Sequence, residues 1–156
     1  MTLPKGTLVM MAMAMALPMI GDSAAFPNAL ARRGCTQEDM PAIELFLTRE
    51  SFDGNAEPRK PYLHVEVAWG DFTRLTGRDL ELVPLKREEK HRSLPLVRAE
   101  LAGEQGSPVW LSGQLRLTHV EVDKRVEGSY RFLAPDKSVL KGEFKARWVG
   151  TQQRCG

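Results

Sequence analysis

The sequence predicts an all-β domain, for three reasons. Apolar and polar residues alternate along several short segments, turn-forming residues separate those segments, and no long stretch has an apolar period near 3.6. We therefore expect a single antiparallel β-sandwich of about seven strands that ends in a three-stranded meander. A small closed β-barrel is the alternative, because a terminal meander can also close a barrel.

Period-two patterning marks the earlier strands. Ile43–Leu47, Leu63–Val67 and Leu80–Val83 alternate apolar with polar residues, and Leu96–Leu101 is a weaker match. Between them, Asp71–Gly77 has the form of one helical turn, with the aspartate as N-cap and the glycine as its end. Counting the later segments as well, the expected strands begin near residues 43, 62, 79, 96, 109, 126 and 139.

Three segments that begin with glycine predict the closing meander. Each places apolar residues two and four positions after its glycine, and tight turns around Lys124 and Asp136 connect them. The segments are Gly113–Leu117, Gly128–Phe132 and Gly142–Ala146, the last of which continues to Trp148.

The second turn fixes a register in which each glycine faces an aromatic ring. Phe132 lies opposite Leu140, Tyr130 opposite Gly142, and Gly128 opposite Phe144. Around the first turn the apolar residues change from odd to even positions. One extra residue near Thr118 and His119 restores the pattern, so a β-bulge is expected there.

The first 25 residues are typical of a signal peptide. Lys5 precedes the apolar run Thr7–Ile20, which as a helix reaches only ~21 Å, against a hydrocarbon core of ~30 Å. Small residues at Ser23–Ala25 predict cleavage before Phe26, with an uncleaved membrane anchor as the alternative. We expect a secreted or periplasmic protein without a stable membrane anchor after cleavage.

Cys35 and Cys155 are the only cysteines, and in an exported chain we expect them to form a disulfide. A metal pair or a redox couple is less favoured, because no histidine is near either residue in the sequence. The expected organisation is a tail over 26–42 that carries Cys35, a β-sandwich over 43–149, and a tail over 150–156 that carries Cys155. The disulfide would then join two tails.

Neither charge nor motifs indicate a reaction. The net charge of +2 comes from 22 basic and 20 acidic residues, which argues against nucleic acid. His64, His91 and His119 lack metal-ligand spacing, and neither G-x-S-x-G nor S-x-x-K occurs. We expect no enzyme, metal or cofactor. A pair of strand glutamates with glycosidase geometry is the exception to test; the candidates are Glu44, Glu66, Glu81, Glu100, Glu121 and Glu143.

Two groups of residues are candidates for a binding surface. Four basic residues of the meander are expected on its polar side, beside Glu121, Glu127 and Glu143; they are Arg116, Arg131, Lys145 and Arg147. A mixed-charge solvent face is the simpler interpretation, and a face for an acidic polymer is the alternative. Trp69 and Trp110 lie at strand ends and are open to either core or surface, whereas Trp148 is expected in the core.

These observations favour an exported, non-enzymatic β-sandwich domain with an unspecified binding or envelope-structural role, whose macromolecular partner is unknown. One alternative is a carrier for a small apolar ligand inside a barrel. It would conflict with an interior filled by Leu115, Tyr130, Phe132 and Phe144. The other alternative is a hydrolase that depends on paired carboxylates.

Overall fold

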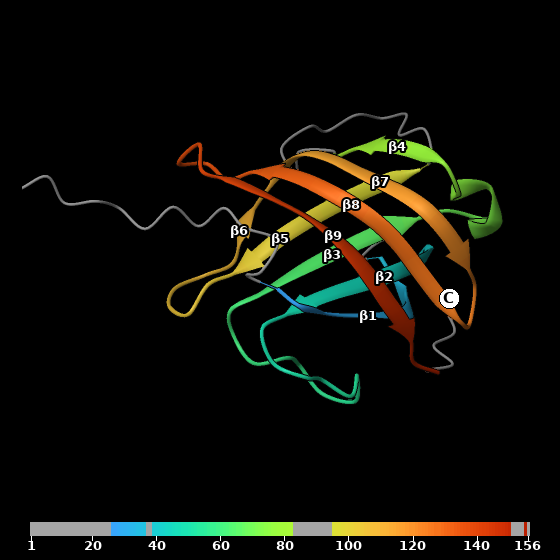
Figure 1. The fold of residues 1–156 in the computed structure, drawn as a ribbon, viewed down its shortest axis with the longest axis horizontal. Coiled ribbons are helices and arrows are strands. Elements are labelled where there is room, and N and C mark those ends of the chain that lie inside the picture. The colour runs from blue at the N-terminus through green and yellow to red at the C-terminus, as the bar shows by residue number, and fades with distance from the viewer. Residues whose placement is uncertain (1–25, 37–38, 83–94, 151–154, 156) are drawn as a thin grey trace, which may run out of the picture.

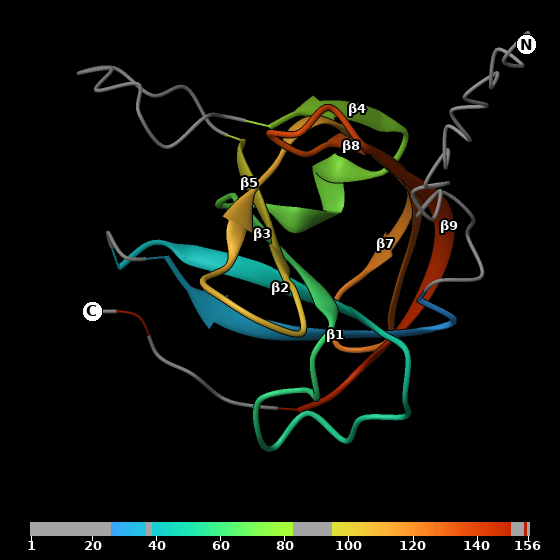
Figure 2. The same cartoon turned by 90° about the vertical axis from the view of Figure 1, so that its left-hand side faces the viewer.

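The computed structural model describes residues 26–36, 39–82, 95–150 and 155, and this part of the chain is all-β. Its nine strands form one sheet in the order β4-β7-β8-β9-β1-β2-β3-β5-β6. The strands are β1 (Asn28–Cys35), β2 (Pro41–Thr48), β3 (Tyr62–Ala68), β4 (Arg78–Glu81), β5 (Leu96–Ala102), β6 (Val109–Trp110), β7 (Ser112–Glu121), β8 (Arg125–Leu133) and β9 (Val139–Trp148). The sheet curls into a half-barrel (Figures 1 and 2).

Nearly all neighbouring strands are antiparallel, and β1 and β9 form the one parallel pair within the ordered sheet. An isolated parallel bridge also joins Leu82, just after β4, to Val97 of β5. The bridge links the first strand of the sheet order to the last but one. The all-β class is thus confirmed, and the sheet has nine strands where the sequence predicted about seven.

The first strand was missed in the sequence pattern. The segment expected to be a tail contains β1, which pairs with β2 along its whole length, so the prediction of a tail over 26–42 is wrong in that respect. Leu30 and Ala31 are consecutive and both buried, because β1 is covered on its two faces. Such a strand shows no period-two pattern. The strand expected near residue 109 is split at Leu111 into β6 and β7.

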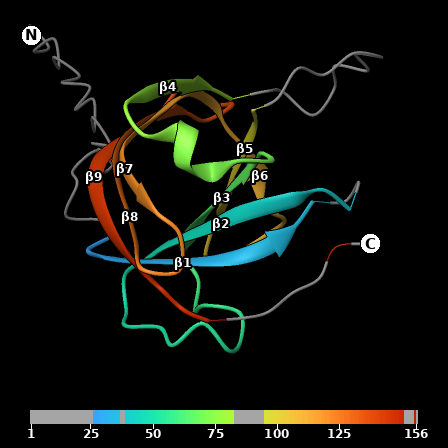
Figure 3. The same cartoon turned by 90° about the vertical axis from the view of Figure 1, so that its right-hand side faces the viewer.

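The closing meander and its register are confirmed. Tyr130 pairs with Gly142, Gly128 with Phe144, and Phe132 with Leu140. The register between β7 and β8 shifts between Leu117 and His119, which is the expected bulge. The single helical turn is also confirmed: η2 (Phe72–Leu75) is a 3-10 turn capped by Asp71. It covers one end of the curled sheet (Figure 3).

The inner face of the sheet holds the main core, to which Ile43, Val97 and Phe132 contribute fully buried side chains. The outer face of β1, β2, β3 and β5 carries a second apolar cluster, composed of Leu30, Phe46, Tyr62 and Ala102. The β2–β3 connection passes below this face in Figure 2 and packs Phe52 against it. Half of the sheet is therefore buried on both sides.

The expected disulfide between Cys35 and Cys155 is present, with an S–S distance of 2.03 Å. Cys35 is the last residue of β1, so the bond ties the C-terminal segment to the sheet and does not join two tails. The Sγ of Cys155 lies 3.5 Å from the carbonyl oxygen of Gly34. In the described residues, no helix is long and apolar enough to cross a membrane.

Candidate functional site

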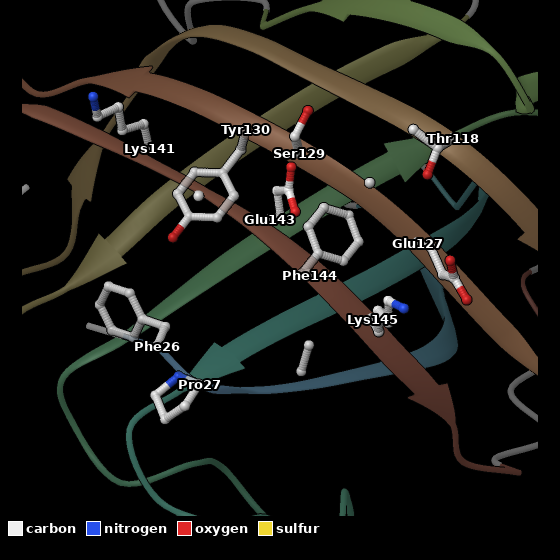
Figure 4. Close-up of a pocket in the computed structure, with 13 residues that line it drawn as sticks. Phe26, Pro27, Thr118, Glu127, Ser129, Tyr130, Lys141, Glu143, Phe144 and Lys145 are labelled. Atoms are coloured by element: carbon white, nitrogen blue, oxygen red, sulfur yellow. The ribbon is translucent and has the colours of Figure 1, made fainter. Parts of the chain in front are cut away.

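A groove opens where β1 and β9 diverge. The two strands pair only at Leu30 with Arg147 and at Ala31 with Trp148. Before these pairs lies a pocket of about 950 Å³, lined by residues of β7, β8 and β9, by Phe26 and Pro27, and by Ala29 of β1. Figure 4 shows its lining, which consists of Phe26, Pro27, Ala29, Thr118, Glu127, Gly128, Ser129, Tyr130, Lys141, Gly142, Glu143, Phe144 and Lys145.

A second hollow of about 210 Å³ extends the groove along the same seam. It shares Pro27, Ala29 and Lys145 with the first pocket, so the two adjoin. Arg147 lines it as well, and its Nη2 donates a 2.7 Å hydrogen bond to the carbonyl oxygen of Phe52. This bond holds the guanidinium at the rim of the groove.

Basic side chains lie along the rim of the groove and beside it. We call Arg131, Lys141, Lys145 and Arg147 the basic strip; all four are exposed, and Arg131 lies directly opposite Lys141. The first three take part in no ion pair with another residue that the structure describes. Of the two glutamates in the lining, Glu127 is paired with Arg125 at 3.4 Å. Four basic side chains of the strip therefore stand against Glu143, the one glutamate of the lining that has no ion pair with a described residue.

The edge of β9 beside the groove offers free backbone groups. The N–H of Trp148 bonds to Lys124 on the β8 side at 3.0 Å, whereas that of Val149 bonds to Ala31 on the β1 side at 2.8 Å. Backbone groups alternate in direction along a strand, and the β8–β9 register is unbroken. The N–H and C=O groups of Lys141, Glu143 and Lys145 thus face the groove, and no described strand pairs with them.

Aromatic side chains form the inner side of the pocket. Phe26, Tyr130 and Phe144 are 5%, 6% and 5% exposed. In Figure 4 the Tyr130 hydroxyl points from β8 towards Phe26. Burial raises the pKa of Tyr130, so the hydroxyl stays protonated and can donate. It bonds to no other residue within the described ranges.

A separate polar cluster lies on the outer face of β2, β3 and β5. His64 sits between two carboxylates, with Nδ1 3.3 Å from Glu100 and Nε2 3.5 Å from Glu44. Its ring stacks on Phe46 at 4.7 Å. Arg32 completes the cluster through an ion pair with Glu44. These side chains are largely buried; that of His64 is 20% exposed.

His64 and Glu44 both stay charged near neutral pH, so this cluster does not exchange protons there. Burial lowers the pKa of His64, but the carboxylates of Glu100 and Glu44 outweigh burial and raise it to about 9. Burial raises the pKa of Glu44, and hydrogen bonds from His64 and Arg32 bring it below its usual value. His64 is therefore an imidazolium at pH 7, held by ionised carboxylate.

The other candidates from the sequence lie apart from the groove. Arg116 pairs with Asp79 at 2.9 Å on the outer face, and Trp69 is half-buried under the guanidinium of Arg78. Trp110 is 43% exposed on the two-residue strand β6. Trp148 packs against the main core and stays partly exposed.

His119 is at the bulge, 3.6 Å from Glu121, whereas His91 lies outside the described residues. The structure thus places Lys145 and Arg147 two residues apart on β9, in the lining of the second hollow, whereas Arg131 lies opposite Lys141 further along the sheet. Sequence reasoning missed Lys141 and Tyr130, although Lys141 shares the parity of Lys145 and Arg147 along β9.

Neither a metal site nor a known relative assigns a role to these residues. No group of three or more histidine, cysteine or acidic side chains is suitable for a metal ion in the ranges that the structure describes. No protein-family model, curated protein or solved structure matches the chain.

Proposed function

We propose that the protein is an exported, non-enzymatic domain that binds an acidic macromolecule along the seam of β1 and β9. The basic strip beside the groove is the observation that carries this proposal. Export rests on the leader over 1–25, which lies outside the described residues and which we propose is cleaved before Phe26. The disulfide is consistent with an oxidising secreted or periplasmic location.

Repulsion between like charges in the basic strip destabilises the folded protein when no ligand is bound. Arg131 lies opposite Lys141, and Arg147 lies opposite Arg125, whose own charge is partly compensated by Glu127. Like charges that face each other across strands destabilise a sheet, typically by a few tenths of a kcal/mol. An anionic ligand would relieve this repulsion, and an excess of one charge at a groove also speeds association with a ligand of opposite charge.

The two alternative functions have less support. Leu115, Tyr130, Phe132 and Phe144 are all buried in the main core, which weighs against an apolar ligand inside the curl. A carboxylate-dependent hydrolase needs one acid whose pKa is raised. The pKa of Glu44 is instead lowered, and His64 is cationic near neutral pH, which disfavours proton transfer by this cluster.

We also propose that the curled sheet is a small barrel and not a sandwich. All nine strands belong to one hydrogen-bonded sheet, and the Leu82–Val97 bridge joins its β4 end to β5. A sandwich would consist of two separate sheets packed face to face.

The experiment measures binding of fluorescent poly-L-glutamate to the exported protein with its disulfide intact. We expect binding that weakens with salt and falls at least about tenfold in the double variant Lys141→Glu, Lys145→Glu. The matched control is Arg59→Glu, Arg74→Glu, which reverses two exposed charges outside the groove lining, one in the β2–β3 connection and one in η2. Equal losses in both double variants, or no binding by the natural protein, would overturn the proposal.

A further inference from the structure

We propose that the acidic partner is an extended polypeptide segment that adds to the free edge of β9 as a further strand. The inference rests on the proposed function and specifies the chemistry of its partner. A basic groove alone accepts many polyanions. The additional observation is the row of main-chain groups along the β9 edge of this groove, with which no described strand pairs.

The backbone of β9 offers hydrogen-bonding groups to an added strand. Lys141, Glu143 and Lys145 each direct an N–H and a C=O into the groove, and alternate residues supply such groups at the repeat of a β-strand. A polypeptide in extended conformation carries donors and acceptors at that same repeat, whereas a polysaccharide or a nucleic acid does not. Free strand edges of this kind recognise peptides through main-chain hydrogen bonds.

The opposite wall of the groove is a weaker pairing edge than β9. Pro27 lacks a backbone N–H, and β1 reaches β9 only from Leu30 onwards. An added strand would therefore bond to β9 on one of its edges only. This asymmetry makes the proposal testable with chemically modified peptides.

The side chains beside the edge select the sequence of the partner. Odd-numbered residues of β9 point outward, where Lys141 and Lys145 outnumber Glu143 and favour acidic side chains on the same face of an added strand. Even-numbered residues point inward, where Gly142 and Phe144 leave an apolar surface. The pocket also exposes the Tyr130 hydroxyl as a donor. The preferred segment therefore alternates acidic residues with small apolar ones.

The first experiment uses a capped, fluorescent decapeptide of alternating Asp and Val, together with two N-methylated forms. One form is methylated at every Asp nitrogen and the other at every Val nitrogen, so that each loses the donors of one strand edge. We expect one form to bind at least about tenfold more weakly than the parent peptide and the other to bind equally well.

The direction of the added strand decides which of the two N-methylated peptides loses affinity. In an antiparallel pair the acidic residues that face Lys141 and Lys145 also bond to β9, so the Asp-methylated form loses affinity. In a parallel pair the Val-methylated form does. Equal behaviour of the two forms, whether both bind or both fail, would overturn strand addition.

A pair of protein variants tests the same hydrogen bonds by changing β9 instead of the peptide. Glu143→Pro removes an N–H that faces the groove and leaves the β8–β9 ladder intact, whereas Glu143→Ala removes the same carboxylate and keeps the N–H. We expect only the proline variant to lose peptide binding, at least about tenfold. Equal affinities of the two variants would contradict the inference.

Poly-D-glutamate separates the inference from the proposed function, because it has the charge of the L-polymer and the opposite backbone hand. If it binds through the basic strip while the two N-methylated peptides behave alike, the acidic-ligand function stands and strand addition is wrong. If neither polymer nor any peptide binds, both are wrong.

Discussion

The hydroxyl of Tyr130 covers Gly142 on the neighbouring strand, and a Cβ at that glycine would lie 2.9 Å from the hydroxyl oxygen. The pair belongs to the meander core and also lines the groove. The same bare backbone that lets the ring pack leaves its hydroxyl at the pocket surface. The Tyr130–Gly142 pair thus contributes both to the packing of the core and to the proposed binding site.

Replacing Gly142 with valine should destabilise the protein. The branched side chain has no room beside the Tyr130 ring, and forcing atoms into a packed core costs about 1–3 kcal/mol. Urea denaturation measures this cost. The control is Gly70→Val, because nothing lies within 4 Å of a Cβ at Gly70. Similar midpoints for the two variants would show that the ring does not require the glycine.

Breaking the disulfide should lower stability without abolishing the sheet. Cys35→Ser removes a link between residues 120 positions apart, for which the expected loss is about 2–5 kcal/mol. Eight paired residues still hold β1 to β2. Thermal unfolding and far-ultraviolet circular dichroism measure the two effects, and Cys155→Ser should reproduce both. A variant with no sheet signature at low temperature would contradict this expectation.

Stability should fall as the pH rises through the titration of His64. Its pKa in the folded protein is about 9, above the unfolded value of about 6.5, so protonation favours the folded state. The stabilisation is complete below pH 6.5 and is lost towards pH 9, on the order of 1–3 kcal/mol in all. Denaturation at several pH values measures it. His64→Gln should flatten the profile between these limits, and an unchanged profile would refute the assignment.

Lys141→Glu should stabilise the free protein slightly while weakening its binding of acidic ligand. The change replaces a repulsion with Arg131 by an attraction, worth a few tenths of a kcal/mol. Arg116→Glu should have the opposite effect on stability, because it breaks the pair with Asp79. Both effects should shrink in high salt. A loss of stability in both variants would argue against repulsion in the strip.

The meander was predictable because its information is local. The spacing of Gly128 and Gly142 and the parity of the apolar residues define both the register and the bulge. The contact of β1 with β9 joins residues such as Leu30 and Arg147, which are far apart in the chain. No local pattern indicates such a contact, and the groove exists because the two strands diverge on the N-terminal side of it.

The polar cluster could not be predicted from the sequence for a similar reason. The sequence pattern places three residues of the cluster on the polar side of their strands: Glu44, His64 and Glu100. Whether their side chains lie close together depends on the register across β2, β3 and β5. The sequence therefore identified individual members of both sites. It did not indicate which members meet, because that depends on strand order.

Amide hydrogen exchange, followed by NMR, reports on strand addition at β9 residue by residue. In the free protein the amides of Lys141, Glu143 and Lys145 should exchange fast, while those of Gly142 and Phe144, which bond to β8, should be protected. Saturation with the alternating Asp–Val decapeptide should protect the first three and leave the other two unchanged. Continued fast exchange of all three in the saturated complex would contradict strand addition at β9.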